Sequence, residues 1–217
     1  MIVLIDNGHG IDTAGKCSPD KRLREWSWAR EIAGLLGSRL KGQGLDARLL
    51  VPEDSDVALA ERCRRVNAVC ERHGKDNVLL VSIHVNAAGD GAQWKTAGGW
   101  SVYTSPRQTK SDVLATELWN AANKRLKPYI DRFQMLQREG KYDSKQTAMR
   151  ADWSDGDPDY EARFAVLTGT KCAAVLTESL FQDNEADTDF LLSAEGKKAI
   201  VELHADGIMS YIKKMKS

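Results

Sequence analysis

The strongest constraint in this sequence is that three short apolar runs each lead to a side chain that can bind a metal or move a proton. The runs are IVLID, NVLLVS and AAVLT, and they lead to His9, His84 and Glu178. None of the runs alternates strictly between apolar and polar residues, which is typical of strands buried on both faces. Because residues after the carboxyl ends of parallel strands meet at one edge of an α/β sheet, we expect these three side chains to share a site.

The stretches between the first runs have the pattern of helices. Apolar residues recur at three- and four-residue steps from Leu23 to Leu40, before a glycine stop at 42–44, and again between Val57 and His73. The alternation of strand and helix from Ile2 to Ile83 predicts βαβ crossovers. The fold class is therefore α/β with a parallel core.

Composition limits the domain organisation and the partners. A chain of 217 residues that is 42% hydrophobic can bury one core, and no linker is apparent, so residues 1–217 are expected to form a single domain. The 31 basic and 31 acidic residues give zero net charge, which disfavours nucleic-acid binding. The four cysteines are isolated and fit reduced structural residues.

The chain contains no apolar stretch near the roughly 20 residues that a transmembrane helix needs. The first expected strand begins at Ile2, so no signal peptide is visible. We expect a protein that stays in the cytoplasm, leaves by a route not encoded here, or has lost a leader.

Residues 127–159 have few periodic apolar positions and contain the turn-rich sequence WSDGDP. Long irregular insertions in compact domains are often functional loops. We expect this segment to be an irregular insertion that faces the substrate, as a lid or a wall.

Two of only four histidines, His9 and His84, stand at expected strand ends, and such imidazoles suit zinc (Zn2+). Glu25, in the opening turn of the first helix, is the best third ligand. Glu178 would then stay off the metal as the general base, with a pKa raised by its apolar neighbours. A histidine after a strand is also frequently a plain loop residue. His73 fits a helix terminus and His204 a semi-buried packing position.

The motifs IDNGHG, VSIHVNA, GGWSVYTS and AAVLTESLFQDN occur in order along nearly the whole chain, with Glu25 between the first two. In this pattern the sequence resembles the zinc-dependent N-acetylmuramoyl-L-alanine amidases of the type 3 amidase family. The resemblance implies a single three-layer domain with a twisted, mostly parallel central sheet and helices on both faces. It also implies that His9, Glu25 and His84 bind zinc, and that Glu178 is the catalytic carboxylate.

The implied reaction is hydrolysis of the amide between N-acetylmuramic acid and L-alanine in peptidoglycan, by water that the metal activates. Asn7 replaces the usual proline before Gly8-His9, and Ile11 replaces a second glycine after the histidine. The exported members' leader and wall-binding module are not visible. An endolysin-like enzyme made in the cytoplasm and released at lysis, or a trimmed leader, would reconcile this with action on the cell wall; the oligomeric state stays open.

Weaker expectations concern residues around this site. Asn86 and Arg150 are candidate substrate-binding residues, with Arg163 as a further arginine for stem-peptide carboxylates. Asp6 is expected to hold the free ring nitrogen of a ligand histidine. Three tryptophans are candidates for stacking on sugar rings, against the default of ordinary packing: Trp94, Trp100 and Trp153. The rival functions are another zinc peptidase or deacetylase, and a non-catalytic wall-binding or regulatory module.

Overall fold

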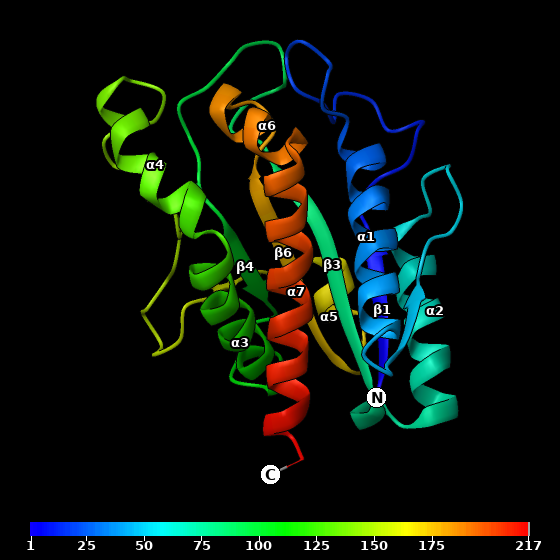
Figure 1. The fold of residues 1–217 in the computed structure, drawn as a ribbon. Helices are drawn as coiled ribbons and strands as arrows, with labels where there is room; N and C mark the ends of the chain where they lie inside the picture. The colour runs from blue at the N-terminus through cyan, green and yellow to red at the C-terminus, as the bar shows by residue number, and fades with distance from the viewer. Residues whose placement is uncertain (217) are drawn as a thin grey trace.

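A single six-stranded sheet forms the centre of the molecule in the computed structural model, which describes residues 1–216 (Figure 1). Its strands are β1 (Ile2–Asn7), β2 (Asp46–Leu49), β3 (Val78–Asn86), β4 (Ser101–Thr104), β5 (Tyr160–Glu161) and β6 (Ala173–Phe181). Their order across the sheet is β2-β1-β3-β6-β4-β5. The three apolar runs of the sequence therefore form three neighbouring strands.

Strand direction confirms the expected, mostly parallel sheet. β1 is parallel to β2 and β3, and β3 is parallel to β6. β4 is antiparallel to β6, and the short β5 follows the direction of β4. The carboxyl ends of β1, β3 and β6 consequently lie at the same edge, where ligands bind in open α/β sheets.

Helices cover both faces of the sheet and complete three layers (Figure 1). The helices are α1 (Glu25–Lys41), α2 (Leu59–His73), α3 (Lys110–Arg125), α4 (Lys127–Arg138), α5 (Ala165–Thr168), α6 (Glu185–Leu192) and α7 (Ala194–Lys214), with a 3₁₀ turn at Lys75–Asn77. One buried apolar cluster joins the sheet to α1, α3 and α7, and a smaller one joins it to α2 and α5. The expected three-layer architecture is confirmed.

Close packing of α3 against α7 depends on a glycine. A Cβ atom at Gly207 would lie 2.8 Å from the Cα of Leu118, which is closer than real contacts allow. The glycine lets the two helices approach each other over one face of the sheet. The two helices form a close-packed layer against β6, the strand that contains Glu178.

The structure corrects the expectation of an irregular segment over residues 127–159. Its first part is helix α4, which buries only Tyr129 and Phe133. Tyr129, Phe133 and Leu136 recur at four- and three-residue steps, so the segment does carry a helical apolar pattern, which the sequence interpretation missed. The remainder, residues 139–159, consists of turns and irregular backbone, as expected.

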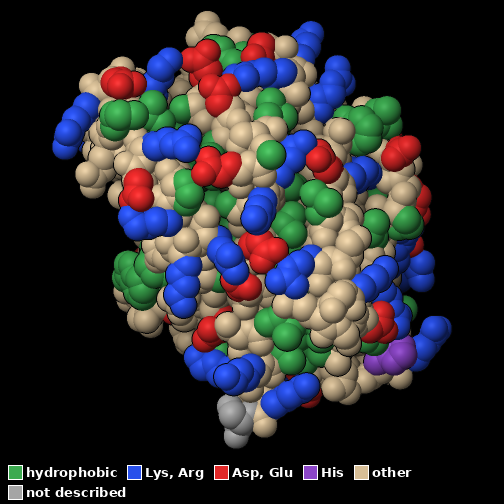
Figure 2. Space-filling model, viewed as in Figure 1, with side chains coloured by type: hydrophobic (Ala, Val, Ile, Leu, Met, Phe, Trp, Pro, Cys, Tyr) green, Lys and Arg blue, Asp and Glu red, His purple; other side chains and the backbone are tan. Residues whose placement is uncertain are grey.

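Acidic and basic side chains are interspersed on the face of the molecule drawn in Figure 2, in keeping with the zero net charge. Within residues 1–216, none of the helices combines the length and the apolar character that crossing a membrane requires.

Candidate metal centre

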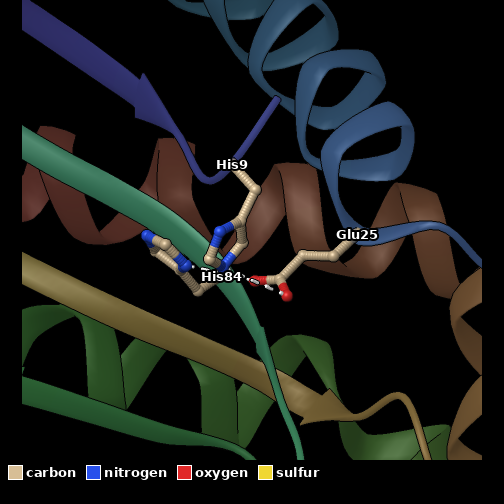
Figure 3. Close-up of side chains that lie close together, drawn as sticks. All are labelled: His9, Glu25 and His84. Atoms are coloured by element: carbon tan, nitrogen blue, oxygen red, sulfur yellow. Dashed lines mark hydrogen bonds and ion pairs between the residues drawn. The ribbon is translucent and has the colours of Figure 1, made fainter. Parts of the chain in front are cut away.

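The structure brings His9, Glu25 and His84 together at the carboxyl edge of the sheet (Figure 3). His9 lies just after β1, His84 lies in β3, and Glu25 is the first residue of α1. His84 Nδ1 is 3.1 Å from Glu25 Oε1, and His9 Nε2 is 3.5 Å from Glu25 Oε2. The three side chains point toward one another, so one ion between them can be reached by all three.

The Glu25 carboxylate is buried, and the protein satisfies only part of it. Oε1 accepts a hydrogen bond from the backbone N–H of Val85 at 3.0 Å, whereas Oε2 has no hydrogen-bond partner among the described residues. A buried carboxylate oxygen without a partner is costly, and a bound cation removes that cost. Two imidazole nitrogens and a carboxylate oxygen form a donor set that suits zinc.

Neighbouring charges set the protonation of the cluster. Burial raises the pKa of Glu25, but the hydrogen bond and charge of His84 outweigh burial and hold that pKa below its usual value. Burial lowers the pKa of His9. Burial also opposes protonation of His84, yet the hydrogen bond and charge of Glu25 raise the pKa of that ring. Glu25 is therefore ionised, and the ring of His9 is neutral near pH 7.

The crowded backbone around His9 explains why both residues that flank it are glycines. His9 has a φ of 60°, in the left-handed region. A Cβ at Gly8 would lie 2.5 Å from the His84 ring, and a Cβ at Gly10 would lie 2.0 Å from the backbone nitrogen of Asp56. Both glycines are needed for the close approach of the two histidines and of the loop that contains Asp56.

The sequence interpretation missed two arginines that hold this loop in place. Arg30 Nη1 donates to the carbonyl oxygen of His9 at 3.0 Å. Arg62, which is buried, donates to Asp6 at 2.6 Å and to the carbonyl oxygen of Asn7 at 2.8 Å. Arg62 and Asp6 are separated by 56 residues, so no local pattern announces the pair.

The predicted hydrogen bond between Asp6 and a ligand histidine is wrong. The Asp6 carboxylate accepts hydrogen bonds from Arg62 and from Ser82 Oγ, both at 2.6 Å. Side chains alternate along a strand, and Asp6 shares its face of β1 with Leu4, which packs in the cluster with α2. This face directs the carboxylate to Arg62 on α2.

Glu178 lies beside His84, because the two residues are register partners on β6 and β3. Both line a cavity of about 490 Å³, together with His9 and Glu25. Burial raises the pKa of Glu178 to about 7, and the charge of Glu25 contributes in the same direction. Glu178 Oε2 is buried and has no hydrogen-bond partner among the described residues. A group with this pKa can both accept and return a proton at neutral pH.

Of the two candidate substrate-binding residues, Asn86 lines the cavity and Arg150 does not. The side-chain oxygen of Asn86 accepts a hydrogen bond from the N–H of Ala87 at 2.8 Å. The guanidinium of Arg150 lies 5.1 Å from the ring centroid of Phe181, and its charge lowers the pKa of Glu178. Arg163 is exposed.

None of the three candidate tryptophans lines the cavity that contains Glu178. Trp100 is fully buried in the core, so the expectation that it faces sugar is wrong. Trp153 is 57% exposed and packs edge-on against Trp119, with ring centroids 5.4 Å apart. Trp94 lies under the guanidinium of Arg22. These aromatic rings contact other side chains of the protein, which is the more common role of tryptophan. The positions of tryptophans in a sequence do not distinguish this packing role from a sugar-binding role.

Two histidines and a glutamate at the carboxyl edge of a mostly parallel sheet, beside a second glutamate in one cavity, are typical of the α/β class of metal-dependent hydrolases. The particular family follows from sequence comparison. The chain belongs to the N-acetylmuramoyl-L-alanine amidase family, whose model matches residues 3–210. This confirms the resemblance seen in the motifs.

Curated relatives are similar over most of the chain. An endolysin of Bacillus phage SPP1 is 26% identical over 214 residues, covering 95% of this chain and 64% of the endolysin. The N-acetylmuramoyl-L-alanine amidase AmiA of Escherichia coli K12 is 27% identical over 231 residues, covering 97% of this chain and 75% of AmiA. The chain thus spans less than two thirds of the length of the phage relative.

Solved structures share the fold. An N-acetylmuramoyl-L-alanine amidase from Clostridium difficile 630 superposes with a TM-score of 0.72 at 22% identity, covering 98% of this chain and 96% of that one. The amidase Ami1 from Mycobacterium smegmatis gives a TM-score of 0.73 at 16% identity, covering 99% and 97%. At these identities the similarity establishes the fold.

Proposed function

We propose that this protein is a zinc-dependent N-acetylmuramoyl-L-alanine amidase, which hydrolyses the amide bond between N-acetylmuramic acid and L-alanine in peptidoglycan. The observation that carries the proposal is the position of Glu178, in register with His84 and in the same cavity as His9 and Glu25. Membership of the amidase family supports the choice of substrate.

His9, Glu25 and His84 are the residues that would hold the metal, because they offer two ring nitrogens and a carboxylate oxygen that lacks a hydrogen-bond partner. Zinc bound there would polarise the substrate carbonyl and lower the pKa of water toward about 7. Glu25 is buried and its pKa is depressed, so it is suited to be a permanent anionic ligand. The three ligands leave a coordination position open, as in catalytic zinc sites.

Glu178 is the proton-transfer residue in this proposal. Its carboxylate takes a proton from the attacking water as the new C–O bond forms. It then delivers that proton to the alanine nitrogen as the C–N bond breaks, so that the amine leaves neutral. A pKa of about 7, raised by burial, matches both steps at neutral pH.

Substrate contacts are proposed for Asn86, which lines the cavity, and for Arg150, which does not line it. Asn86 lies at its edge and is proposed to orient the muramyl or alanyl part of the substrate. Arg150 is proposed to attract carboxylates of the stem peptide, since its charge acts on Glu178 and a guanidinium binds carboxylates in a bidentate manner. The irregular residues 139–159, which contain Arg150, are proposed to form the substrate-facing wall.

The proposed site of action is the cell wall. Two relatives are consistent with this location, a phage endolysin and a bacterial amidase. An endolysin-like route, with synthesis in the cytoplasm and release at lysis, is the proposed way to reach it, in keeping with the phage relative.

Product analysis tests the proposal. Purified peptidoglycan is digested with the zinc-loaded protein, and the soluble products are identified by mass spectrometry. We expect stem peptides with a free L-alanine amino terminus and glycan strands that keep intact lactyl groups. Cleavage within the stem peptide would identify an endopeptidase instead, loss of acetyl groups a deacetylase, and binding without products a non-catalytic wall-binding module.

A further inference from the structure

A second cluster of possible metal ligands lies outside the cavity already described. It consists of Asp112, Asp157 and Asp159, each of which offers one carboxylate oxygen within 4.8 Å of the others. Asp112 is in the first turn of α3, and the other two lie in the irregular segment just before β5. The cluster therefore joins two segments that are more than 40 residues apart in the chain.

The cluster concentrates carboxyl groups in a buried place. Asp112 is 4% exposed and Asp159 is 2% exposed. Within residues 1–216, none of the ion pairs that lysine, arginine or histidine side chains form includes any of the three aspartates. Buried carboxylates ordinarily pair with a cation or bind a metal, so this group lacks its usual compensation.

Two oxygens of the cluster are buried and receive no hydrogen bond from a donor group among the described residues, namely Oδ1 of Asp157 and Oδ1 of Asp159. The two carboxyl groups can hydrogen-bond to each other only when one of them is protonated. The other oxygen of each carboxylate is held by a donor. Thr104 Oγ1 donates to Asp159 Oδ2, and Gln108 Nε2 donates to Asp157 Oδ2 at 2.9 Å. The protein thus fixes both carboxylates and leaves one oxygen of each unused inside the cluster.

We propose that Asp112, Asp157 and Asp159 bind a hard divalent cation of the Ca²⁺ or Mg²⁺ type. The three aspartates offer only oxygen ligands, which Ca²⁺ and Mg²⁺ prefer. The group of His9, Glu25 and His84 instead includes the nitrogen donors that suit zinc. Burial raises the pKa of Asp159 to about 8, and the hydrogen bond and charge of Asp157 act in the same direction.

The position of the cluster gives the cation a structural task. Asp159 is followed by β5, which pairs with β4. The chain then continues to Phe164, Ala165 and Val166, which line the cavity with Glu178. A cation bound by all three aspartates would link Asp157 and Asp159 to Asp112 at the start of α3. It would thereby hold the cavity wall formed by Phe164, Ala165 and Val166 in place.

Calorimetry and thermal unfolding test the proposal. The protein is freed of loosely bound ions on a chelating resin, reloaded with one equivalent of zinc, and titrated separately with CaCl₂ and MgCl₂. We expect one additional ion to bind, and Tm to rise by about 5 °C or more at a hundredfold excess over Kd. The ion with the larger rise is the preferred one. If neither ion binds or raises Tm, the proposal is overturned.

Two aspartate variants localise the effect. Asp159→Asn removes one ligand charge at nearly constant shape, and we expect it to weaken Ca²⁺ binding by about tenfold or more. Asp155→Asn is the matched control, because Asp155 is exposed on the same segment and also accepts a hydrogen bond from Gln108. It should keep the full response. An Asp159→Asn protein that responds to Ca²⁺ like the wild type would contradict the assignment.

A second measurement does not depend on thermal stability. Tb³⁺ replaces Ca²⁺ at oxygen sites, and Tyr160 follows Asp159 directly. Excitation of the protein should give Tb³⁺ emission that Ca²⁺ displaces, and that Asp159→Asn abolishes. Emission that persists in this variant would place the ion elsewhere.

Discussion

His84 and His204 occupy opposite sides of the sheet beside the same strand, and they differ in almost every property. His84 lies next to Glu178 of β6 on the cavity side, where Glu25 raises its pKa. His204 on α7 is fully buried on the other side, next to Thr177 of β6. Burial lowers the pKa of His204 to about 4.

The partners of each ring explain the difference. His84 Nδ1 faces a buried carboxylate, whereas His204 Nδ1 donates to the carbonyl oxygen of Ile200 at 2.7 Å. With that tautomer, His204 Nε2 accepts a hydrogen bond from the Thr177 hydroxyl at 2.9 Å. A neutral imidazole with both nitrogens used by the protein has no capacity for a metal. The neighbours of each ring, rather than the residue type, therefore separate a candidate metal ligand from a packing residue.

The largest expected effect comes from His84→Ala. The variant should lose stoichiometric zinc and all measurable hydrolysis of peptidoglycan, because one of three ligands is missing. Elemental analysis and product release measure the two losses. His73→Ala is the matched control, since His73 is exposed at the end of α2 and should keep both properties. Full zinc content in His84→Ala would show that His84 is not a metal ligand.

Glu178→Gln is expected to separate chemistry from metal binding. Zinc content should stay at one per chain, while kcat/KM falls by about 10² to 10⁴, the usual contribution of general acid–base catalysis. Glu71→Gln, at an exposed position on α2, should retain wild-type activity. A Glu178→Gln protein that loses its zinc would show that Glu178 is a ligand, contrary to the proposed role.

His204 should affect stability and its dependence on pH. Its pKa is about 4 in the folded protein against an ordinary value of 6.5. Above pH 6.5 the ring is neutral in both states; as pH falls from 6.5 toward 4, the unfolded chain gains a proton that the folded protein does not. The free energy of unfolding should therefore drop by up to about 3 kcal/mol over this interval.

Denaturant unfolding between pH 7.5 and 4.5 measures this contribution by comparison with His204→Asn. The variant should be less stable than the wild type at pH 7.5, because the buried hydroxyl of Thr177 loses its partner at 2.9 Å and keeps only the longer contact of 3.4 Å to the carbonyl oxygen of Ser82. The gap should narrow at low pH. Zinc content at pH 7.5 should be unchanged. Equal pH dependence in the two proteins would refute the contribution assigned to His204.

Arg30→Met should have the smallest of these effects, a reduced affinity for zinc. Arg30 holds the carbonyl oxygen of His9 and that of Glu53, so its loss loosens the ligand loop. Positioning groups around metal ligands are typically worth about 10- to 100-fold in affinity. Competition with a zinc chelator measures the change, and exposed Arg72→Met serves as control. Unaltered affinity would remove Arg30 from the positioning role.

The parts of the site that the sequence predicted are those with a local signal. Apolar runs identified β1, β3 and β6, and parallel direction then placed His9, His84 and Glu178 at one edge. What the sequence could not predict depends on tertiary contacts. Arg62 finds Asp6 across 56 residues, and the acidic cluster forms only when the segment before β5 reaches α3. Trp100 could not be distinguished from a binding residue before its burial was known.

The two ends of the sheet have a consequence for behaviour at high concentration. β2 has four residues and β5 has two, so each outer strand exposes only a few backbone groups that could pair with another chain. β2 also carries the charged pair of Asp46 and Arg48. Short and charged outer strands are a common protection against edge-to-edge aggregation. The long apolar strands β1, β3 and β6 lie inside the sheet, where each is hydrogen-bonded to a neighbouring strand on both sides.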